Sequence, residues 1–538
     1  MKRLILTLIT VCVAALAAAQ TLGVEGPGRV KLYARADFAV TTPTVPDNPY
    51  LQEEAALDML LTSPSGKQLV LPCFWTGKGT GWAARFMPQE KGKYTFVFRY
   101  REAGKPELTS AQGSFRVRGK KGRGILHTAG NWILKFDDGT PYRGVGENIC
   151  WESRDRDDSK FFSELHEKAD RYNYDVMLPE FAAAGGNFVR MWMCSWNFPI
   201  DRHDHFNNSR YTPSEEYFNP SAVERLDHVV SLAEKLNISI MLCMGPGDVR
   251  TDASFFTSGE AKTRYRNYLR YIVSRWGYSP AIGMWEFFNE IDNIQFRNSR
   301  EPIPAQDITA WHGQMSTYLK SIDPFGHIVT TSISHRDVEG MNDLPDLDIN
   351  QKHIYRATSA IPGTVADYEK RHGKPYIIGE FSYEWDWSKN FDDFADDMDI
   401  DFKRGLWYGL FSPTPVTPMS WWWEYFDNRG MVPYFKGVRK VSDIMLKSGG
   451  GAFEPLEVEA NGAEAFAVRC GKCIFAYVFN PGAEAVNSVS VKLSGKYKVR
   501  AFDFGTAAFG KAASMSADGE LVIPLSLGSK EGALFEIR

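Results

Sequence analysis

The sequence predicts an α/β protein in which a (β/α)8 TIM barrel is flanked by N-terminal and C-terminal β-sandwich domains. Between about residues 141 and 448, short apolar stretches alternate with helical stretches such as AVERLDHVVSLAEKL. About eight such units in roughly 300 residues have the size of a barrel. Before and after this zone the chain has short alternating stretches between turn clusters, which is the pattern of β-sandwiches.

The eight barrel strands are expected within residues 142–149, 186–193, 238–245, 281–290, 328–334, 347–355, 376–381 and 418–425. A doubly wound sheet is the alternative, but it normally has a glycine-rich phosphate turn after its first strand. The sequence has no such turn. The barrel is therefore the better prediction, and its catalytic groups should lie at the C-terminal ends of the strands.

The chain divides into three domains after its first residues. We expect an N-terminal β-sandwich over residues 20–118, the catalytic barrel over 125–448 and a C-terminal β-sandwich over 449–538. The stretch from Arg118 to Gly124, RGKKGRG, is basic and glycine-rich. It is interpreted as a solvated linker, with binding of an acidic polymer as the alternative.

Residues 1–19 have the layout of a secretory signal peptide. Two basic residues precede an apolar stretch, and an alanine run ending at Ala19 offers a cleavage site. We therefore expect a secreted or periplasmic protein, with association with the cell surface also open. A lipid anchor at Cys12 is the competing interpretation, but Val11 stands where such a signal has a small residue.

Charge and composition exclude several classes of protein. The chain has 62 lysines and arginines against 66 aspartates and glutamates, so it lacks the basic field of a generic nucleic-acid binder. After the signal peptide no apolar run approaches the ~18 residues of a membrane span. Aromatic residues make up 14% of the chain, which favours surfaces that stack on flat partners such as sugar rings.

Cysteines and acidic clusters do not indicate a metal or a redox centre. Cys470 and Cys473 flank a two-residue turn between predicted strands, so a hairpin, with a disulfide as an option, is favoured over redox chemistry. Residues 201–205 lack the tight spacing of a zinc site and are interpreted as a substrate-contacting loop. The run 392–401 lacks the glycine of an EF-hand loop and is better explained as acids that open a helix. We expect no metal and no cofactor.

Two glutamates end predicted barrel strands. Glu290 ends the fourth, where a period of two places Glu286, Phe288 and Glu290 on one face, and Glu380 ends the seventh. Such a pair can divide the work of glycoside cleavage, because a protonated carboxyl donates to the leaving oxygen while an ionised one attacks the anomeric carbon. A single strand-end carboxylate more often pairs with an arginine or caps a helix, so the signal lies in the pair.

The sequences around these glutamates, Asn289-Glu290 and Gly379-Glu380, resemble the signatures of clan A retaining glycoside hydrolases, most closely family 5. Further matches at strand ends are Arg190 in GNFVRMW, His353 and Tyr355 in HIY, and the run from Trp421 to Trp423. The N-terminal zone resembles the uncharacterised module that precedes bacterial hydrolases of this kind. The third strand departs from the pattern, because it lacks the histidine usual in family 5; Asp248 is the candidate substitute.

Resemblance and placement together imply the site. The expected catalytic residues are Glu290 and Glu380, and the expected substrate-binding residues are Arg190, Asn289, His353, Tyr355, Trp422 and Trp423. Glu380 is the nucleophile, its pKa lowered by Arg190 and Tyr355, and Glu290 is the acid/base, its pKa raised by the charge of Glu380. Asn289 would donate to the sugar 2-hydroxyl. His353 is a substrate contact, an orienting group for Tyr355 or an ordinary barrel residue, and Trp422 or Trp423 is the sugar platform, since neighbours on a strand point opposite ways.

The predicted function is that of a secreted retaining β-glycoside hydrolase, which cleaves a β-linked polysaccharide or oligosaccharide by double displacement. Two alternatives stay open: a catalytically inactive carbohydrate-binding barrel, and a transglycosylase on the same scaffold. The sequence also leaves open the sugar, the linkage, the choice between internal and terminal cleavage, and the oligomeric state. Aromatic residues in the loops 195–206 and 382–391 favour an extended sugar-binding cleft.

Overall fold

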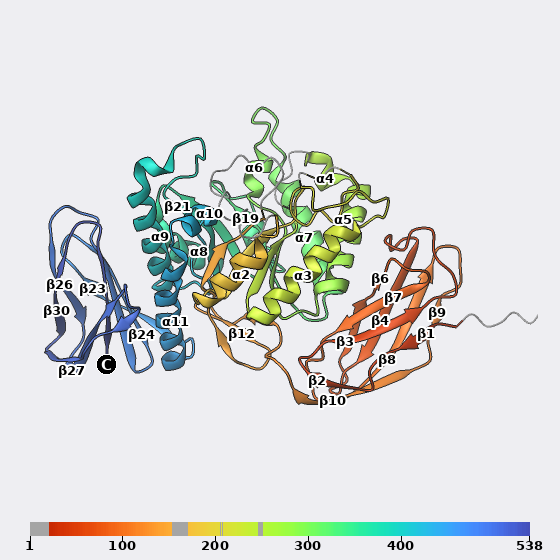
Figure 1. Ribbon diagram of the computed structural model, residues 1–538, viewed down its shortest axis with the longest axis horizontal. Coiled ribbons are helices and arrows are strands. Elements are labelled where there is room, and N and C mark those ends of the chain that lie inside the picture. Colours follow the sequence, from red (N-terminus) through yellow and green to blue (C-terminus); the bar gives the residue numbers. More distant parts are fainter. Residues whose placement is uncertain (1–20, 153–170, 205, 207, 246–250) are drawn as a thin grey trace, which may run out of the picture.

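The computed structural model describes residues 21–152, 171–204, 206, 208–245 and 251–538. Three parts lie in a row, with a β module at each end and a central part of strands surrounded by helices (Figure 1). The predicted signal peptide lies outside the described residues, as do His205 and Asp248. No helix within the described ranges has the length and apolar character needed to cross a lipid bilayer.

The N-terminal part consists of two sheets around one apolar core. The first has the order β1, β3, β7, β6, and the second has the order β2, β10, β8, β4, β5, with β9 paired to β8. Every second residue of β3 is buried, as expected for a strand with one face on a core. The strands are β1 (Gly23–Glu25), β2 (Arg29–Leu32), β3 (Ala36–Thr41), β4 (Ala55–Thr62), β5 (Gln68–Pro72), β6 (Phe74–Trp75), β7 (Gly81–Phe86), β8 (Gly92–Glu102), β9 (Leu108–Thr109) and β10 (Gly113–Lys120).

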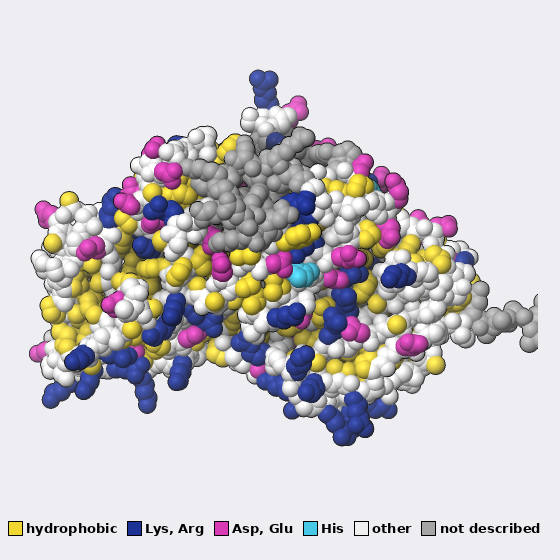
Figure 2. Space-filling model, viewed as in Figure 1, with side chains coloured by type: hydrophobic (Ala, Val, Ile, Leu, Met, Phe, Trp, Pro, Cys, Tyr) yellow, Lys and Arg dark blue, Asp and Glu magenta, His cyan; other side chains and the backbone are white. Residues whose placement is uncertain are grey.

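The stretch expected to be a linker is in part a strand. β10 continues through Lys120 and pairs with β2, with a register shift between Val117 and Lys120. Gly119 has a φ of 71° at this shift, a conformation that glycine adopts at little cost. Lysine and arginine side chains gather at this end of the module (Figure 2).

A small three-stranded sheet closes the bottom of the barrel. It consists of β11 (Leu126–Thr128), β12 (Leu134–Phe136) and β13 (Pro141–Tyr142). Its apolar side chains form one buried cluster with residues of the barrel strands, among them Met284 and Val416. The N-terminal end of the barrel is therefore filled, and the opposite end is the one that can hold a site.

Eight parallel segments form the (β/α)8 barrel. One sheet has the order β14 (Gly146–Asn148), β15 (Phe188–Trp192), β16 (Ser239–Cys243), β17 (Ile282–Glu286) and β18 (Ile328–Thr330), and a second has the order β19 (Ser332–Ile333), β20 (Asn350–Tyr355) and β21 (Tyr376–Ser382). β18 and β19 are separated by one residue and are two parts of the fifth segment, in which β18 pairs with β17 and β19 with β20. The eighth segment, residues 416–420, is bridged to both neighbours, Val416 to Gly144 and Ser420 to Phe381. Because these bridges join the last strand to the first, the ring is closed.

Helices surround the strands on the outside (Figure 1). They are α2 (Tyr174–Ala183), α3 (Pro220–Leu236), α4 (Ala253–Thr257), α5 (Gly259–Trp276), α6 (Ile291–Gln295), α7 (Ala305–Ile322), α8 (Ile361–His372), α9 (Ala395–Leu410), α10 (Trp423–Asn428) and α11 (Phe435–Gly449). The helices predicted from periodicity at 222–236 and 263–276 are confirmed as parts of α3 and α5. Asp396 and Asp397 lie in the first turn of α9, as expected for acids that open a helix.

Two predicted strands are shorter than expected, and both differences affect the site. β17 ends at Glu286, and Glu290 instead has a φ of 49° and precedes α6. In the eighth segment, Trp422 has a φ of 62° and α10 begins at Trp423. The tryptophan run is therefore not a strand, because the chain turns at Trp422 into a helix. The expected alternation of neighbouring side chains therefore does not apply at either place.

The C-terminal part also has two sheets. The larger contains β22 (Phe453–Leu456), β24 (Glu464–Cys470), β25 (Cys473–Phe479), β31 (Gly532–Ile537), β27 (Gly495–Asp503), β28 (Ala508–Phe509) and β29 (Ala513–Ala517); the smaller contains β23 (Val458–Glu459), β26 (Val486–Lys492) and β30 (Glu520–Leu527). The predicted hairpin at Cys470 and Cys473 is confirmed, and both thiols are free and buried. The module packs on the barrel helices, where the rings of Trp407 in α9 and Tyr477 in β25 stack at 5.8 Å.

Candidate active site

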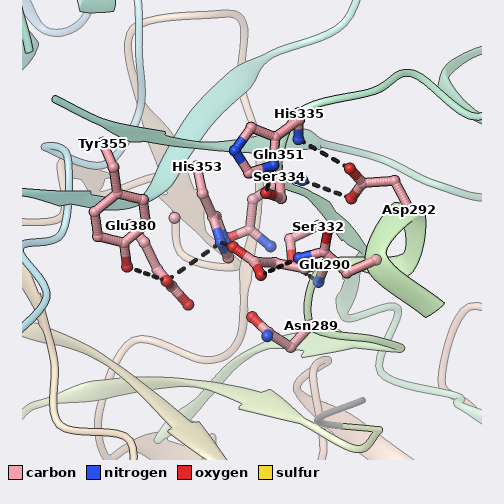
Figure 3. Close-up of polar contacts among 12 residues, drawn as sticks. Asn289, Glu290, Asp292, Ser332, Ser334, His335, Gln351, His353, Tyr355 and Glu380 are labelled. Atoms are coloured by element: carbon pink, nitrogen blue, oxygen red, sulfur yellow. Dashed lines mark hydrogen bonds and ion pairs between the residues drawn. The ribbon is translucent and has the colours of Figure 1, made fainter. Parts of the chain in front are cut away.

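Glu380 lies near the C-terminal end of β21, which is buried along its whole length, and is surrounded by hydrogen-bond donors (Figure 3). Arg190 Nη1 donates to its Oε1 at 2.5 Å, and the Tyr355 hydroxyl donates to its Oε2 at 2.5 Å. Nδ1 of His353 lies 3.3 Å from the same Oε2. The two contacts expected for Glu380, with Arg190 and Tyr355, are thus both present.

Arg190 is the central cation of the site. It projects from β15 with its side chain fully buried, and its Nε and Nη2 donate to both oxygens of Glu286 at 2.7 and 2.8 Å. Nη2 also donates to Oδ1 of Asn289 at 2.8 Å. A planar guanidinium can satisfy several acceptors at fixed angles. Arg190 therefore fixes the nucleophile candidate and the asparagine beside Glu290 in one arrangement.

Glu290 is held at the top of the barrel by its backbone as well as by its side chain. Its N–H donates to Ser332 Oγ at 2.9 Å, which supports the left-handed backbone at this position. Its Oε2 accepts from Asn293 Nδ2 at 2.7 Å, and its Oε1 lies 2.8 Å from His353 Nδ1. The side chain keeps 20% exposure, so a substrate can reach it.

The two glutamates lie close to each other across His353. One ligand atom each from Glu290, His353 and Glu380 lie within 4.8 Å of one another. In the part of the chain that the structure describes, this is the single group of three such side chains with metal-ligand geometry; neither residues 201–204 nor the acidic run 392–401 forms one. An oxygen-to-oxygen approach this short fits carboxyl groups about 5 to 5.5 Å apart better than the ~6.5 to 9.5 Å of a site that holds a water between them.

Glu290 has the proton affinity of a general acid. Burial, together with the charge of Asp292, raises its pKa to about 7, although Arg190 acts in the opposite direction. The expected direction is confirmed, but the expected cause is wrong: burial and Asp292, not Glu380, are the main contributors. A carboxyl with a pKa near 7 is protonated in a large fraction of molecules at neutral pH, as proton donation requires.

The expected lowering of the Glu380 pKa is wrong. Burial raises it, and the charge of Glu290 acts in the same direction, although Arg190 and the hydrogen bond from Tyr355 act to lower it. The reason is that complete burial penalises the charged form more than one shared arginine favours it. Glu380 nevertheless accepts two charge-assisted or short hydrogen bonds that Glu290 lacks, so it is the better candidate for the ionised partner.

His353 is neutral at physiological pH, because burial lowers its pKa to about 4. It therefore adds no charge between the two carboxyl groups. Its side chain contacts Glu290 and Glu380 and makes no hydrogen bond to Tyr355, so it lies between the two glutamates and is not the orienting group for Tyr355.

The three tryptophans take different positions from those expected. Trp423 is 1% exposed and packs edge-on against Trp151, with ring centroids 4.8 Å apart. Trp422 is 8% exposed, and its indole N–H donates to the backbone oxygen of Glu384 at 2.7 Å. Trp421 is the partly exposed member, and its ring lies 5.5 Å from that of Trp192. Of the run, Trp421 is the best placed to meet a ligand.

Several residues of the site were not selected from the sequence. Glu286 is completely buried as the partner of Arg190, and Gln351 donates to it at 2.9 Å. Close packing explains why a glycine, Gly379, precedes Glu380: a Cβ at this position would lie 2.1 Å from Gln351 Oε1. Asp292 accepts from three consecutive backbone N–H groups, at residues 334–336, and so anchors the loop after β19. These roles depend on contacts between distant segments, which no local motif signals.

Comparison with known proteins supports a glycoside hydrolase domain in the central part of the chain. The model of cellulase, glycosyl hydrolase family 5, matches residues 156–393, a range that includes both Glu290 and Glu380. The central part is a clan A glycoside hydrolase domain of the family 5 type. A model of a domain of unknown function, DUF5060, matches residues 29–101, which confirms that an uncharacterised module precedes the barrel.

Curated relatives of this glycoside hydrolase domain carry mannanase names. Mannan endo-1,4-beta-mannosidase A from Podospora anserina is 26% identical over 251 residues, which cover 39% of this chain and 65% of that protein. Mannan endo-1,4-beta-mannosidase F from Aspergillus fumigatus is 26% identical over 206 residues, which cover 30% of this chain and 45% of that protein. The chain thus spans less than two thirds of either relative.

A solved structure shares the fold of nearly the whole chain. A candidate glycoside hydrolase from Bacteroides vulgatus superposes with a TM-score of 0.68 at 14% identity, and the match covers 95% of this chain and 99% of that one. At this identity the likeness concerns the fold alone. It shows that one other chain adopts a similar fold over nearly its whole length.

Proposed function

We propose that the protein is a secreted, retaining glycoside hydrolase that cleaves the β-1,4-linked backbone of a mannan at internal positions. The observation that carries the proposal is the approach of Glu290 and Glu380, whose nearest ligand atoms and that of His353 lie within 4.8 Å. This spacing is close to that of retaining enzymes and favours direct attack by one of the glutamates.

In the first step Glu290 is the acid and Glu380 the nucleophile. The Glu290 proton moves to the glycosidic oxygen as the bond from that oxygen to the anomeric carbon breaks, and a Glu380 oxygen bonds to the anomeric carbon. The leaving sugar departs with the proton, and a covalent glycosyl-enzyme remains. The raised pKa of Glu290, about 7, supports its role as the donor.

In the second step the now ionised Glu290 removes a proton from a water, and the water oxygen attacks the anomeric carbon. The bond to Glu380 breaks and the carboxylate is regenerated, so the product keeps the β configuration. Arg190 and Tyr355 hold the two oxygens of Glu380 through both steps. Asn289 has its Oδ1 fixed by Arg190, which leaves its amide N–H groups free to donate to the sugar 2-hydroxyl.

The choice of mannan, and that of internal cleavage, rest on the two relatives, which are both named mannan endo-1,4-beta-mannosidases. Export is proposed from the signal-peptide layout of residues 1–19. We also infer that the two flanking parts are β-sandwiches with a structural role. Two sheets with an apolar core in each part support this, and the strand-end carboxylates that carry the proposed chemistry lie in the barrel.

Incubation with a panel of polysaccharides, with new reducing ends as the readout, tests the proposal. Galactomannan and glucomannan should be cleaved fastest, with products of several sizes appearing early, and xylan and β-glucan much more slowly. Release of single sugars alone would overturn internal cleavage, and preference for a glucan would overturn the substrate. Binding without cleavage would favour the inactive barrel, and products longer than the substrate would favour the transglycosylase.

A further inference from the structure

The segment that follows Glu380 exposes an unusual number of aromatic side chains. In the described residues seven large apolar side chains are strongly exposed, and three of them fall within five positions: Tyr383 at 40%, Trp385 at 53% and Trp387 at 72%. Tryptophan is normally highly buried, and clustered exposed apolar side chains mark binding surfaces. This cluster therefore needs a ligand as its explanation.

The carboxylate between these aromatic residues is turned inward instead. Glu384 is 5% exposed, and it accepts hydrogen bonds from Arg356 and Lys389 and from the backbone N–H groups of Trp385 and Asp386. Although burial alone would raise it, the pKa of Glu384 is lowered to about 2 by these donors. The charged side chain of Glu384 is thus buried while the neighbouring indoles are exposed. This is the reverse of the usual distribution, in which glutamate is exposed and tryptophan is buried.

Further polar contacts fix the backbone of the segment. Asp386 Oδ1 accepts from the backbone N–H of Ser388 at 3.0 Å and from its hydroxyl at 2.6 Å. The indole N–H of Trp422 donates to the backbone oxygen of Glu384 at 2.7 Å. Because these hydrogen bonds fix the backbone of the segment, its two indoles are held in defined positions before a ligand binds.

This surface is continuous with the candidate active site. Tyr355 donates to Glu380, and the next residue, Arg356, donates to Glu384 and lies with its guanidinium carbon 5.2 Å from the ring centre of Trp385. The segment between β21 and α9 lies at the rim where the strands have their C-terminal ends (Figure 1). Adjacent residues, Tyr355 and Arg356, thus connect Glu380 with Trp385.

We propose that Trp385 and Trp387 form a distal subsite, on which sugar rings of the β-linked chain beyond the reacting sugar stack. The proposal rests on the proposed function and adds the place where the polymer is held. The Cα atoms of these residues are at most about 7 Å apart, so the two indoles can serve neighbouring sugars of one chain. The flat, apolar face of a pyranose ring suits an indole, whereas its hydroxyl groups stay in water.

The variants Trp385→Ala and Trp387→Ala test the subsite. For each, kcat/KM is measured with galactomannan and with a nitrophenyl β-mannobioside, which is too short to reach the distal subsite. The ratio of the polymer value to the aryl glycoside value should fall about tenfold, mainly through KM, and should fall further in the double variant. Val522→Ala removes an exposed apolar side chain from the C-terminal part and should leave the ratio unchanged.

An unchanged ratio in the double variant would overturn the subsite while leaving the proposed function intact. A binding measurement distinguishes failure of the subsite from failure of the proposed function. Retardation of the Glu380→Gln protein in a galactomannan gel should weaken when Trp385 and Trp387 are also replaced. If the wild-type protein cleaves no polysaccharide, the proposed function fails and the gel result still decides the subsite. If none of the polysaccharides in the panel retards the protein, the subsite is overturned, and the exposed aromatic residues would instead point to a protein ligand.

Discussion

Two ion-pair clusters in this molecule, each built around a buried charged side chain, differ in their ratio of carboxyl groups to arginines. In the candidate active site one arginine, Arg190, faces the carboxyl groups of Glu286 and Glu380 directly, and Glu290 lies nearby. Where the N-terminal part meets the barrel, one carboxylate, Asp58, faces three arginines: Arg99 and Arg101 from β8 at 3.4 and 3.0 Å, and Arg270 from α5 at 2.6 Å.

The ratio decides the proton affinity of each cluster. Burial raises the pKa of Glu290 to about 7 and also raises that of Glu380, because a single arginine cannot offset it. Burial acts on Asp58 in the same direction, but Arg270 and the other arginines outweigh it, so its pKa is lowered. A surplus of carboxyl groups thus keeps one of them protonated in part at neutral pH. A surplus of arginines keeps Asp58 ionised, and its role is to bind the N-terminal part to the barrel.

The pH dependence of stability follows with opposite signs. The lowered pKa of Asp58 contributes stability above the pKa of an unfolded aspartate, and this contribution is lost as the pH falls through the folded value. The raised pKa of Glu290 contributes stability that is present below the pKa of an unfolded glutamate and is lost as the pH rises toward about 7. The active site is therefore less stable where it is functional, as expected of a catalytic centre.

The largest effect on activity is expected for Glu380→Gln. Loss of the nucleophile should lower kcat by about 10⁴-fold. Because one carboxylate is removed from a cluster with a surplus of them, the melting temperature should stay the same or rise. Steady-state kinetics and calorimetry measure both values, and near-normal turnover would show that Glu380 is not the nucleophile.

The largest effect on stability is expected for Asp58→Asn. Three arginines would lose their single carboxylate at a site where its side chain is 3% exposed, so the free energy of unfolding should fall by about 3 to 5 kcal/mol. The first transition in urea, followed by tryptophan fluorescence of the full chain, gives this value. The comparison of the two clusters would be broken if Asp58→Asn cost no more than Glu380→Gln.

A smaller effect concerns the pH profile. The kcat/KM of the wild type should decline above pH ~7, as Glu290 loses its proton. In Asp292→Asn a negative charge that raises this pKa is removed, so the alkaline limb should move to lower pH. A limb that stays in place, in a variant that keeps its melting temperature, would mean that Asp292 does not tune the acid.

The smallest effect is expected for Asp37→Asn, which also serves as the matched control for Asp58. Asp37 pairs with Arg35 on the surface of the same N-terminal part, where both side chains are about half exposed. Exposed pairs of this kind contribute about 0 to 1 kcal/mol. Urea unfolding of the two aspartate variants side by side should therefore differ by several-fold in the change of free energy.

The barrel could be predicted from the sequence because its pattern is local. Short apolar strands and amphipathic helices alternate along the chain, and the motifs at Glu290 and Glu380 stand at the right strands. The contacts of Glu380 with Arg190 and Tyr355 could be expected for the same reason, since all three end neighbouring or facing strands.

The remainder of the site depends on turns and on distant contacts. Nothing local distinguishes Trp422, with its left-handed backbone, from a strand residue in PMSWWWEY, so the alternation of the tryptophans was wrongly expected. The roles of Ser332 and Asp292 appear only when the loops after β17 and β19 meet. The direction of the Glu380 pKa was missed because the extent of burial is a property of the folded barrel.

The central claim is that Glu380 attacks the sugar directly, assisted by Glu290. Proton NMR of the first product released from a β-linked mannan oligosaccharide tests it most directly, when the spectrum is taken before the free sugar equilibrates. Double displacement predicts that the β anomer appears first and the α anomer only later. Appearance of the α anomer first would show that a water attacks in one step, and would contradict the assignment of both glutamates.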